Sequence, residues 1–230
     1  MTDAGRDLRS ILAGPTLAAG RALLGARIVR DGVDGRRVGR IVEVEAYIGE
    51  DDQASHARFG RTGRNAVMYE GPGTAYVYLV YGMHDCLNIV TEPVGRPAAL
   101  LVRAVEPLEG VELMRRSRAA RIAVRMRLRA ASSDAIAEAR LKRPADARLA
   151  AGPGLVCAAF EIDRSLTGAD LLDPAADVRL EPRPLDEPSP EIVSGPRVGV
   201  GYAAEPWRSE PWRLAIAGHP SVSRPPLRPV

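Results

Sequence analysis

The 230-residue sequence is poor in cysteine, lysine and long hydrophobic runs, and each shortage excludes a class of protein. The two cysteines, Cys86 and Cys157, are too few for a disulfide framework, and the N-terminus has no secretory signal pattern. We expect both to be small core residues. No run of about 18 uninterrupted apolar residues occurs, so no membrane span is predicted. These absences predict a reduced, cytoplasmic protein with no membrane partner.

Motifs for metal, nucleotide or nucleophilic chemistry are also missing. The histidines and cysteines lack H-x-x-x-H and C-x-x-C spacing, and no G-x-S-x-G occurs. The glycine-rich EGPGTAY at 70–76 lacks the ending of a phosphate-binding loop. We therefore predict neither a metal nor a cofactor. A metal-dependent hydrolase built on His56 with Asp51 or Asp52 stays as an alternative, which a chelator would inactivate.

What the chain does contain is enough hydrophobic residue, 46%, to bury a sizeable core. A chain of this length often folds as one domain, which we expect to span residues 1–230. The formal net charge is only +3, but almost all of the positive charge is arginine and the sequence pI is about 9.1. Guanidinium groups match phosphate geometry, which favours a polyanionic partner. Arginine codons in a GC-rich genome would explain the same bias.

Alternating and β-branched runs predict the strands. A strand pair is expected at 26–30 and 37–48, around the turn DGVDG. TAYVYLVYGMHDCLNIVTEP at 74–93 predicts a β-hairpin with Tyr81, Gly82, Met83 and His84 at its tip. Further strands are expected at 98–105 and in the C-terminal runs RVGVGY and WRLAIAG.

Helices are expected around these strands, which makes the fold class mixed α/β (α+β). Residues 1–14 are predicted to be flexible and to lead into a short helix ending near residue 24. Pro107 is expected to open a helix over 107–118, and 155–162 to form a short apolar helix. The arginine-rich segment 115–148 predicts one or two exposed helices with a break at 132–134. The long polar connection 49–74 is where function is expected.

The stretch VEVEAYIGEDDQASH at 42–56 carries the most suggestive polar pattern. Alternation would place Glu43, Glu45 and Tyr47 on one face of a strand. Arg103 lies inside the apolar strand at 98–105, and a buried arginine is rarely left without a carboxylate. We therefore predict that Arg103 pairs with Glu43 or Glu45 on the floor of a polar pocket. A purely structural ion pair is the alternative.

Several blocks of the sequence together carry a resemblance to a known family. In chain order they are EVEAYIGEDDQASHA, RNAVMYEGPGTAYVYLVYGMHDCLNIV, LLVRAVEPLEG, AAGPG and PRVGVGYA. In order and spacing they resemble the alkyladenine (3-methyladenine) DNA glycosylase family, from about residue 15 to residue 223. The resemblance implies one mixed α/β domain with a curved antiparallel sheet and surrounding helices. It also implies a protruding β-hairpin that enters the DNA minor groove while a damaged purine is flipped into a pocket.

The resemblance assigns roles to particular residues. Glu45 matches the general base, and Arg103 and the main-chain carbonyl of Val198 match the groups that hold the attacking water with it. Pocket and DNA contacts are matched by six further residues: Tyr47, Tyr78, His56 and Asn88 in the pocket, and Tyr81 and Met83 at the hairpin tip. Among these, Asn88 would crowd the exocyclic amine of guanine, and Tyr81 would fill the gap left by the flipped nucleotide.

Two features depart from the family pattern. Leu155 stands where the family commonly has lysine, which puts a phosphate or structural contact in doubt. The arginine-rich segment 115–148 is longer than usual, so its role cannot be inherited. It is either an additional DNA contact or a solvated helix.

The function predicted is a monofunctional glycosylase that removes alkylated or deaminated purines in base excision repair. Its partner would be double-stranded DNA containing damaged purines, which it would bind as a monomer and, in the cell, at the nucleoid. A glycosylase that also cuts the strand needs an amine, and the single lysine, Lys142, lies outside the matched blocks. A non-catalytic nucleic-acid-binding domain is the alternative, but it would not need Glu45, Arg103 and Asn88 together.

Overall fold

The longest strands of the protein lie side by side in the middle of one antiparallel sheet. The computed structural model describes residues 7–128, 144–225 and 227. Within these residues the main path of the sheet has the order β3-β4-β5-β2-β1-β7. Its strands are β1 (Arg27–Gly32), β2 (Gly35–Ile48), β3 (Ala75–Val80), β4 (His84–Val90), β5 (Ala98–Glu109) and β7 (Val178–Glu181). Three shorter strands complete it, β6 (Ala150–Ala151) on β5, and β9 (Arg213–Ile216) between β2 and β8 (Ile192–Gly195).

An irregularity in β2 decides which way its acidic residues face. The register of β2 against β5 shifts between Ile41 and Glu43, so Val42 has no partner in the ladder. Because of this extra residue, Ile41 and Val44 both enter the main core, although simple alternation would separate them. Val42 packs on the other side, in a separate apolar cluster with Ala215. The bulge therefore sets the side of the sheet to which the side chains of Glu43 and Glu45 point.

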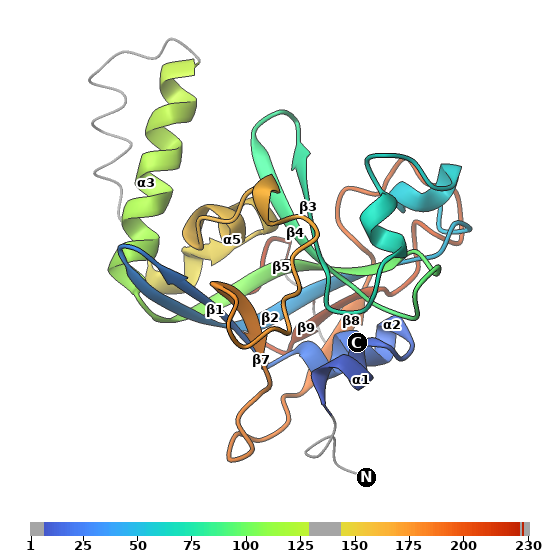
Figure 1. Cartoon of the computed structure of the whole chain (residues 1–230), viewed down its shortest axis with the longest axis horizontal. Helices are drawn as coiled ribbons and strands as arrows, with labels where there is room; N and C mark the ends of the chain where they lie inside the picture. The colour runs from blue at the N-terminus through green and yellow to red at the C-terminus, as the bar shows by residue number, and fades with distance from the viewer. Residues whose placement is uncertain (1–6, 129–143, 226, 228–230) are drawn as a thin grey trace.

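The predicted β-hairpin is present and rises from the sheet (Figure 1). Tyr76 lies opposite Asn88, and Tyr78 lies opposite Cys86. The turn needs left-handed backbone at Tyr81, with φ +52°, and at Gly82, with φ +67°. Glycine adopts this conformation without strain, whereas tyrosine does so at a cost. The tip consequently presents Tyr81 outward, with 85% of its surface exposed.

Helices of two groups, both of which contribute side chains to the main apolar core, pack on the sheet (Figure 1). Below it lie α1 (Leu8–Leu12) and α2 (Thr16–Leu23), and α2 packs on β2 and β5 through its buried face. Above it lies α5 (Pro153–Ala159), which packs on β4 and β5, and α3 (Val111–Leu128) stands beside α5. Short 3-10 helices occur at His56–Phe59, Ala66–Tyr69, Asp146–Arg148 and Arg164–Leu166. The mixed α/β fold class with its open antiparallel sheet is confirmed.

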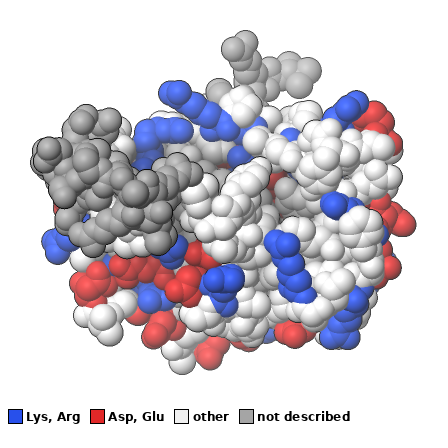
Figure 2. All heavy atoms as spheres, turned by 90° about the horizontal axis from the view of Figure 1, so that it is seen from above, with Lys and Arg blue, Asp and Glu red and all other residues white. Residues whose placement is uncertain are grey.

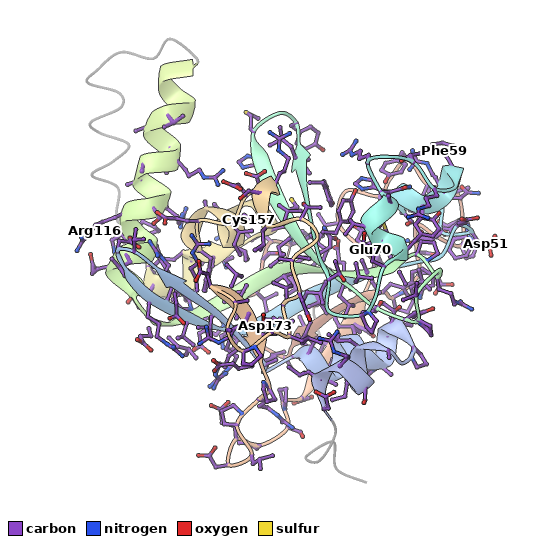
Figure 3. All side chains as sticks on the ribbon, in the orientation of Figure 1. Asp51, Phe59, Glu70, Arg116, Cys157 and Asp173 are labelled. Carbon is purple, nitrogen blue, oxygen red and sulfur yellow. The ribbon has the colours of Figure 1, made fainter. Side chains whose placement is uncertain are left out.

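Other expectations concern the chain ends, the membrane and the thiols. Within the segment 1–14, predicted to be flexible, residues 1–6 lie outside the described part, and Leu12 of α1 is fully buried. Among the described helices, none has the length and apolar character needed to cross a bilayer. The prediction that Cys86 and Cys157 are core residues is confirmed, since both thiols are free and buried, with Cys157 deep inside the molecule (Figure 3).

The structure corrects three predicted elements. The helix expected over 107–118 begins later, at Val111, because β5 continues to Glu109 with Pro107 opposite Gly39, beside a register shift that tolerates its missing N–H. The helix expected at 155–162 begins earlier, with Pro153 in its first turn. RVGVGY is a loop rather than a strand, since buried Arg197 ties it to Asp52 instead.

For the segment 115–148, predicted to be helical, α3 accounts for residues up to Leu128. The break predicted at 132–134 lies outside the described residues.

Candidate active site

A pocket of about 550 Å³ opens between the hairpin, the connection 49–74 and the loop after Arg197. Its walls include most of the predicted site residues: Tyr47, His56, Tyr78, Tyr81, Asn88, Arg103 and Val198. Glu45 lies fully buried behind this surface, in contact with Arg103 and Tyr47. Met83 is the exception, because it lines a smaller cavity beside α3.

Glu45 is held by groups from three different segments of the chain. Its Oε1 accepts the backbone N–H of Val198 at 2.7 Å and lies 3.2 Å from Nη1 of Arg103. Its Oε2 accepts the phenol of Tyr47 at 3.0 Å. The carboxylate is thus fixed in position, and its three partners all line the pocket.

Burial raises the pKa of Glu45 above its ordinary value of 4.5, and repulsion from Glu43 adds to this effect. Arg103, the Val198 N–H and the Tyr47 phenol pull the pKa in the opposite direction. The sequence pointed only to the lowering effect of Arg103. The net direction is upward because the carboxylate has lost its water, which makes it a stronger base when ionised.

Arg103 pairs with both candidate carboxylates, not with one of them. Its Nε lies 3.0 Å from Glu43 Oε1, and its Nη1 lies 3.2 Å from Glu45 Oε1. Only 7% of the Arg103 side chain is exposed. The predicted pairing is therefore confirmed.

Aromatic rings also line the pocket. The His56 ring lies edge-on to Tyr78, with centroids 4.5 Å apart, and its Nδ1 is 2.8 Å from the Tyr76 hydroxyl. Burial, together with Arg64 and Arg58, lowers the pKa of His56 from 6.5 to about 4, so the imidazole is neutral at physiological pH. A neutral imidazole can offer one donor and one acceptor to a bound ring.

Tyr47 is fixed by a cation as well as by Glu45. The guanidinium of Arg197 lies 4.7 Å from the centre of the Tyr47 ring and is itself bound by Asp52 at 2.6 Å. Both members of this ion pair are fully buried. Arg197 therefore supports the ring, while the next residue, Val198, holds Glu45 through its N–H.

Asn88 lines the pocket from β4. Its side-chain nitrogen donates to the carbonyls of Tyr76 at 3.0 Å and Cys86 at 3.3 Å. These two bonds fix the side chain, which is 3% exposed, against one side of the pocket.

The rim of the pocket combines exposed aromatic and cationic side chains. Tyr81 stands at the hairpin tip, and Phe59 lies at the outer end of the connection 49–74, on the same side of the sheet (Figure 3). The guanidinium carbon of Arg58 lies 4.6 Å from the centre of the Phe59 ring and 5.2 Å from the centre of the Tyr202 ring. Figure 2 looks onto this side, where arginines border uncharged side chains and most visible acids lie towards the edges. Such a surface suits a polyanion that also offers flat rings.

The residues proposed for a metal-dependent hydrolase are not brought together. Asp52 is committed to Arg197 and to the backbone N–H groups of Ile48 and Ala54, while Asp51 lies at the outer edge of the molecule (Figure 3). His56 Nδ1 is engaged by Tyr76. In the described ranges, no three His, Cys, Asp or Glu side chains are grouped as metal ligands would be.

Tyr76 and Arg64 are among the pocket-lining residues that the sequence did not assign to the site. Tyr76 could have been found, because strand alternation puts it on the same face as Tyr78. Arg64 lies in an irregular loop with no periodic signal, and only the folded chain brings it within 5.8 Å of the Tyr78 ring.

Comparison with known proteins gives a consistent result. A family model described as methylpurine-DNA glycosylase matches residues 10–220. The human DNA-3-methyladenine glycosylase is 41% identical over 91% of this chain and 65% of its own length, and the mouse protein of that name is 42% identical over 91% and 58%. A Methanocella arvoryzae protein, provisionally named 3-methyladenine DNA glycosylase, is 43% identical over 91% of this chain and 92% of its own.

Proposed function

The chain belongs to the methylpurine-DNA glycosylase family and is a DNA glycosylase, and we propose that it releases modified purines from duplex DNA by hydrolysing the N-glycosidic bond with a water that Glu45 activates. The observation that carries this proposal is the buried Glu45, held by Arg103, Tyr47 and the Val198 N–H behind the wall of an aromatic pocket. The steps below derive what each group would do.

The reacting glycosidic bond is hidden in stacked DNA, so the nucleotide must first be extruded. Extrusion costs a few kcal/mol. Tyr81, 85% exposed at the end of the hairpin, is suited to enter the stack from the minor groove and to replace the lost base contacts. The exposed arginines near the pocket rim would hold the phosphates on either side.

Recognition of the extruded purine would rest on the ring walls of the pocket. Tyr47 and Tyr78, which line the pocket, would stack on the base, and each such contact contributes about 1 to 3 kcal/mol. Alkylation at a ring nitrogen makes the purine cationic, which an aromatic face attracts more strongly than a neutral ring. Neutral His56 avoids the repulsion that an imidazolium would bring.

Asn88 would provide rejection of normal guanine. Its side chain is fixed by two carbonyls, so it cannot move aside for an exocyclic amine. Discrimination by such a clash needs no contact with the correct base.

Hydrolysis then needs a base and a counter-charge for the sugar. As the purine leaves, positive charge develops on the sugar, and Glu45 stabilises it while accepting a proton from water. Arg103 orients that water and keeps Glu45 ionised against the effect of burial. The products are the free purine and an intact strand with an abasic site.

The experiment is excision from duplex oligonucleotides carrying single modified purines, with borohydride present in a parallel reaction. We expect release of the base, strand breaks only after alkali, and no trapped protein–DNA complex, since Lys142 is the sole lysine. A trapped complex would show that an amine attacks the sugar. Tight binding of modified DNA without any base release would instead favour the non-catalytic binding domain.

A further inference from the structure

Behind the pocket, Glu43 joins two buried arginines. Its Oε1 accepts from Arg103 Nε at 3.0 Å, from Arg213 Nε at 2.6 Å and from Ser223 Oγ at 2.9 Å, and its Oε2 accepts the Ser223 backbone N–H at 2.6 Å. Glu43 is fully buried and Arg213 is 2% exposed. Neither residue lines the pocket.

The charges of this cluster balance only when Arg213 is counted. Two carboxylates, Glu43 and Glu45, lie on β2, and Arg103 is within ion-pair distance of both. Arg213 on β9 pairs with Glu43, and its Nη2 donates to the carbonyls of Ser223 at 3.2 Å and Pro225 at 2.7 Å. Without Arg213, one guanidinium would serve two buried carboxylates, of which one would be left uncompensated.

We propose that Arg213 is a positioning residue that neutralises Glu43 and so leaves the charge of Arg103 available to Glu45 and its water. The proposal rests on the proposed function, because it concerns the same base. Arg213 never touches the substrate. It acts through Glu43, which holds Arg103 at Nε and thereby leaves Nη1 directed to Glu45.

Other groups near Glu45 do not replace this contribution. Charged and titratable neighbours act on it from the surrounding strands and loop: Glu43, Tyr47, Arg103, Tyr78, Cys86 and, through the Tyr47 ring, Arg197. The phenols and the thiol are neutral, because burial raises the pKa of Tyr47, Tyr78 and Cys86. Arg197 is committed to Asp52. The balance therefore depends on Glu43, Arg103 and Arg213.

The test is the pH dependence of single-turnover excision in four proteins: the parent, R213M, E43Q and the double variant. A duplex containing 7-methylguanine suits it, because this cationic base leaves without being protonated, so the acidic limb reports the ionisation of Glu45. R213M should move that limb to higher pH by about one unit or more, and E43Q should move it to lower pH. The double variant, with one carboxylate and one arginine left, should return close to the parent limb.

A purely structural role gives a different pattern. Loss of packing would slow excision at every pH, and the double variant would be slower than either single one without restoring the limb. The matched control is R37M. Arg37 is also a buried arginine, but it lies on β2 and pairs with Asp34 and Glu161. The R37M variant should have a lower free energy of unfolding, but the acidic limb of its excision–pH profile should stay at the parent position.

The outcomes separate this inference from the proposed function. An active parent whose limb coincides with that of R213M or E43Q would overturn the inference alone. A parent that excises no modified purine would overturn the proposed function. Where R213M yields no folded protein, the comparison of E43Q with the double variant carries the test, because removing Arg213 from E43Q should move the limb back up towards the parent position, and coincident limbs would overturn the inference.

Discussion

The floor of the pocket and the tip of the hairpin differ in how far their residues are buried and in how many contacts hold them. Glu45 at the floor is fully buried and held by contacts from three segments. Tyr81 at the tip is 85% exposed and sits on a left-handed turn beside Gly82. A reacting group must be held within a fraction of an ångström, whereas a wedge must enter a stack of variable sequence. Under the proposed function, the reacting group would therefore lie on a central strand and the wedge on a projecting turn.

The largest effect is expected at the floor. Glu45→Gln keeps the size of the side chain but removes its charge and its basicity. Single-turnover excision should fall by about 100- to 10,000-fold, the usual contribution of a general base. Affinity for modified DNA should persist, because the stacking walls and the tip are unchanged. Excision by quenched flow and affinity by fluorescence anisotropy measure the two quantities separately.

Glu50→Gln is a matched control for this substitution. Glu50 follows the end of β2 and contacts Tyr69 near the surface, outside the Glu45 cluster. Its excision rate should equal that of the parent. Near-normal excision by Glu45→Gln would show that another group activates the water, and the contrast between floor and tip would lose its basis.

The next effect is expected at the tip. Tyr81→Ser removes the ring that would replace the lost base contacts, so binding of modified duplex should weaken by about 1 to 3 kcal/mol, or about 5- to 150-fold. Single-stranded substrate, which needs no extrusion, should be affected much less. A 2-aminopurine beside the lesion reports unstacking by its fluorescence. An equal fluorescence change in variant and parent would contradict the wedge.

How well each region can be predicted from the sequence depends on how far apart in the chain the interacting residues lie. The hairpin was predictable, because alternation and Gly82 are local signals. The pairing of Arg103 with a glutamate was predictable as well, because a buried arginine needs a carboxylate. The loop at RVGVGY was not, since its conformation depends on Arg197 reaching Asp52, 145 residues away. For the same reason the contribution of Arg213 to Glu43 is visible only in the folded chain.

A smaller effect is expected between floor and tip, at Asn88. Asn88→Ser shortens a side chain that two carbonyls now fix, which opens room beside the purine 2-position. Release of normal guanine should rise by about tenfold, the ratio that about 1.4 kcal/mol gives. Excision of modified adenine should change little. Chromatography of bases released from undamaged DNA measures this, and unchanged guanine release would mean that Asn88 does not set the discrimination.

The smallest effect is a pH dependence of stability that distinguishes the pocket wall from the tip. Burial lowers the pKa of His56 from 6.5 to about 4. Between these values the unfolded chain binds a proton that the folded protein does not, so the free energy of unfolding must fall as pH drops from 6.5 towards 4. His56→Gln removes this contribution, and its stability should decline less steeply over that window. Urea unfolding at several pH values measures it. Tyr81→Ser, which leaves the imidazole in place, should parallel the parent curve, whereas a His56→Gln curve parallel to the parent would show that the imidazole titrates alike in both states.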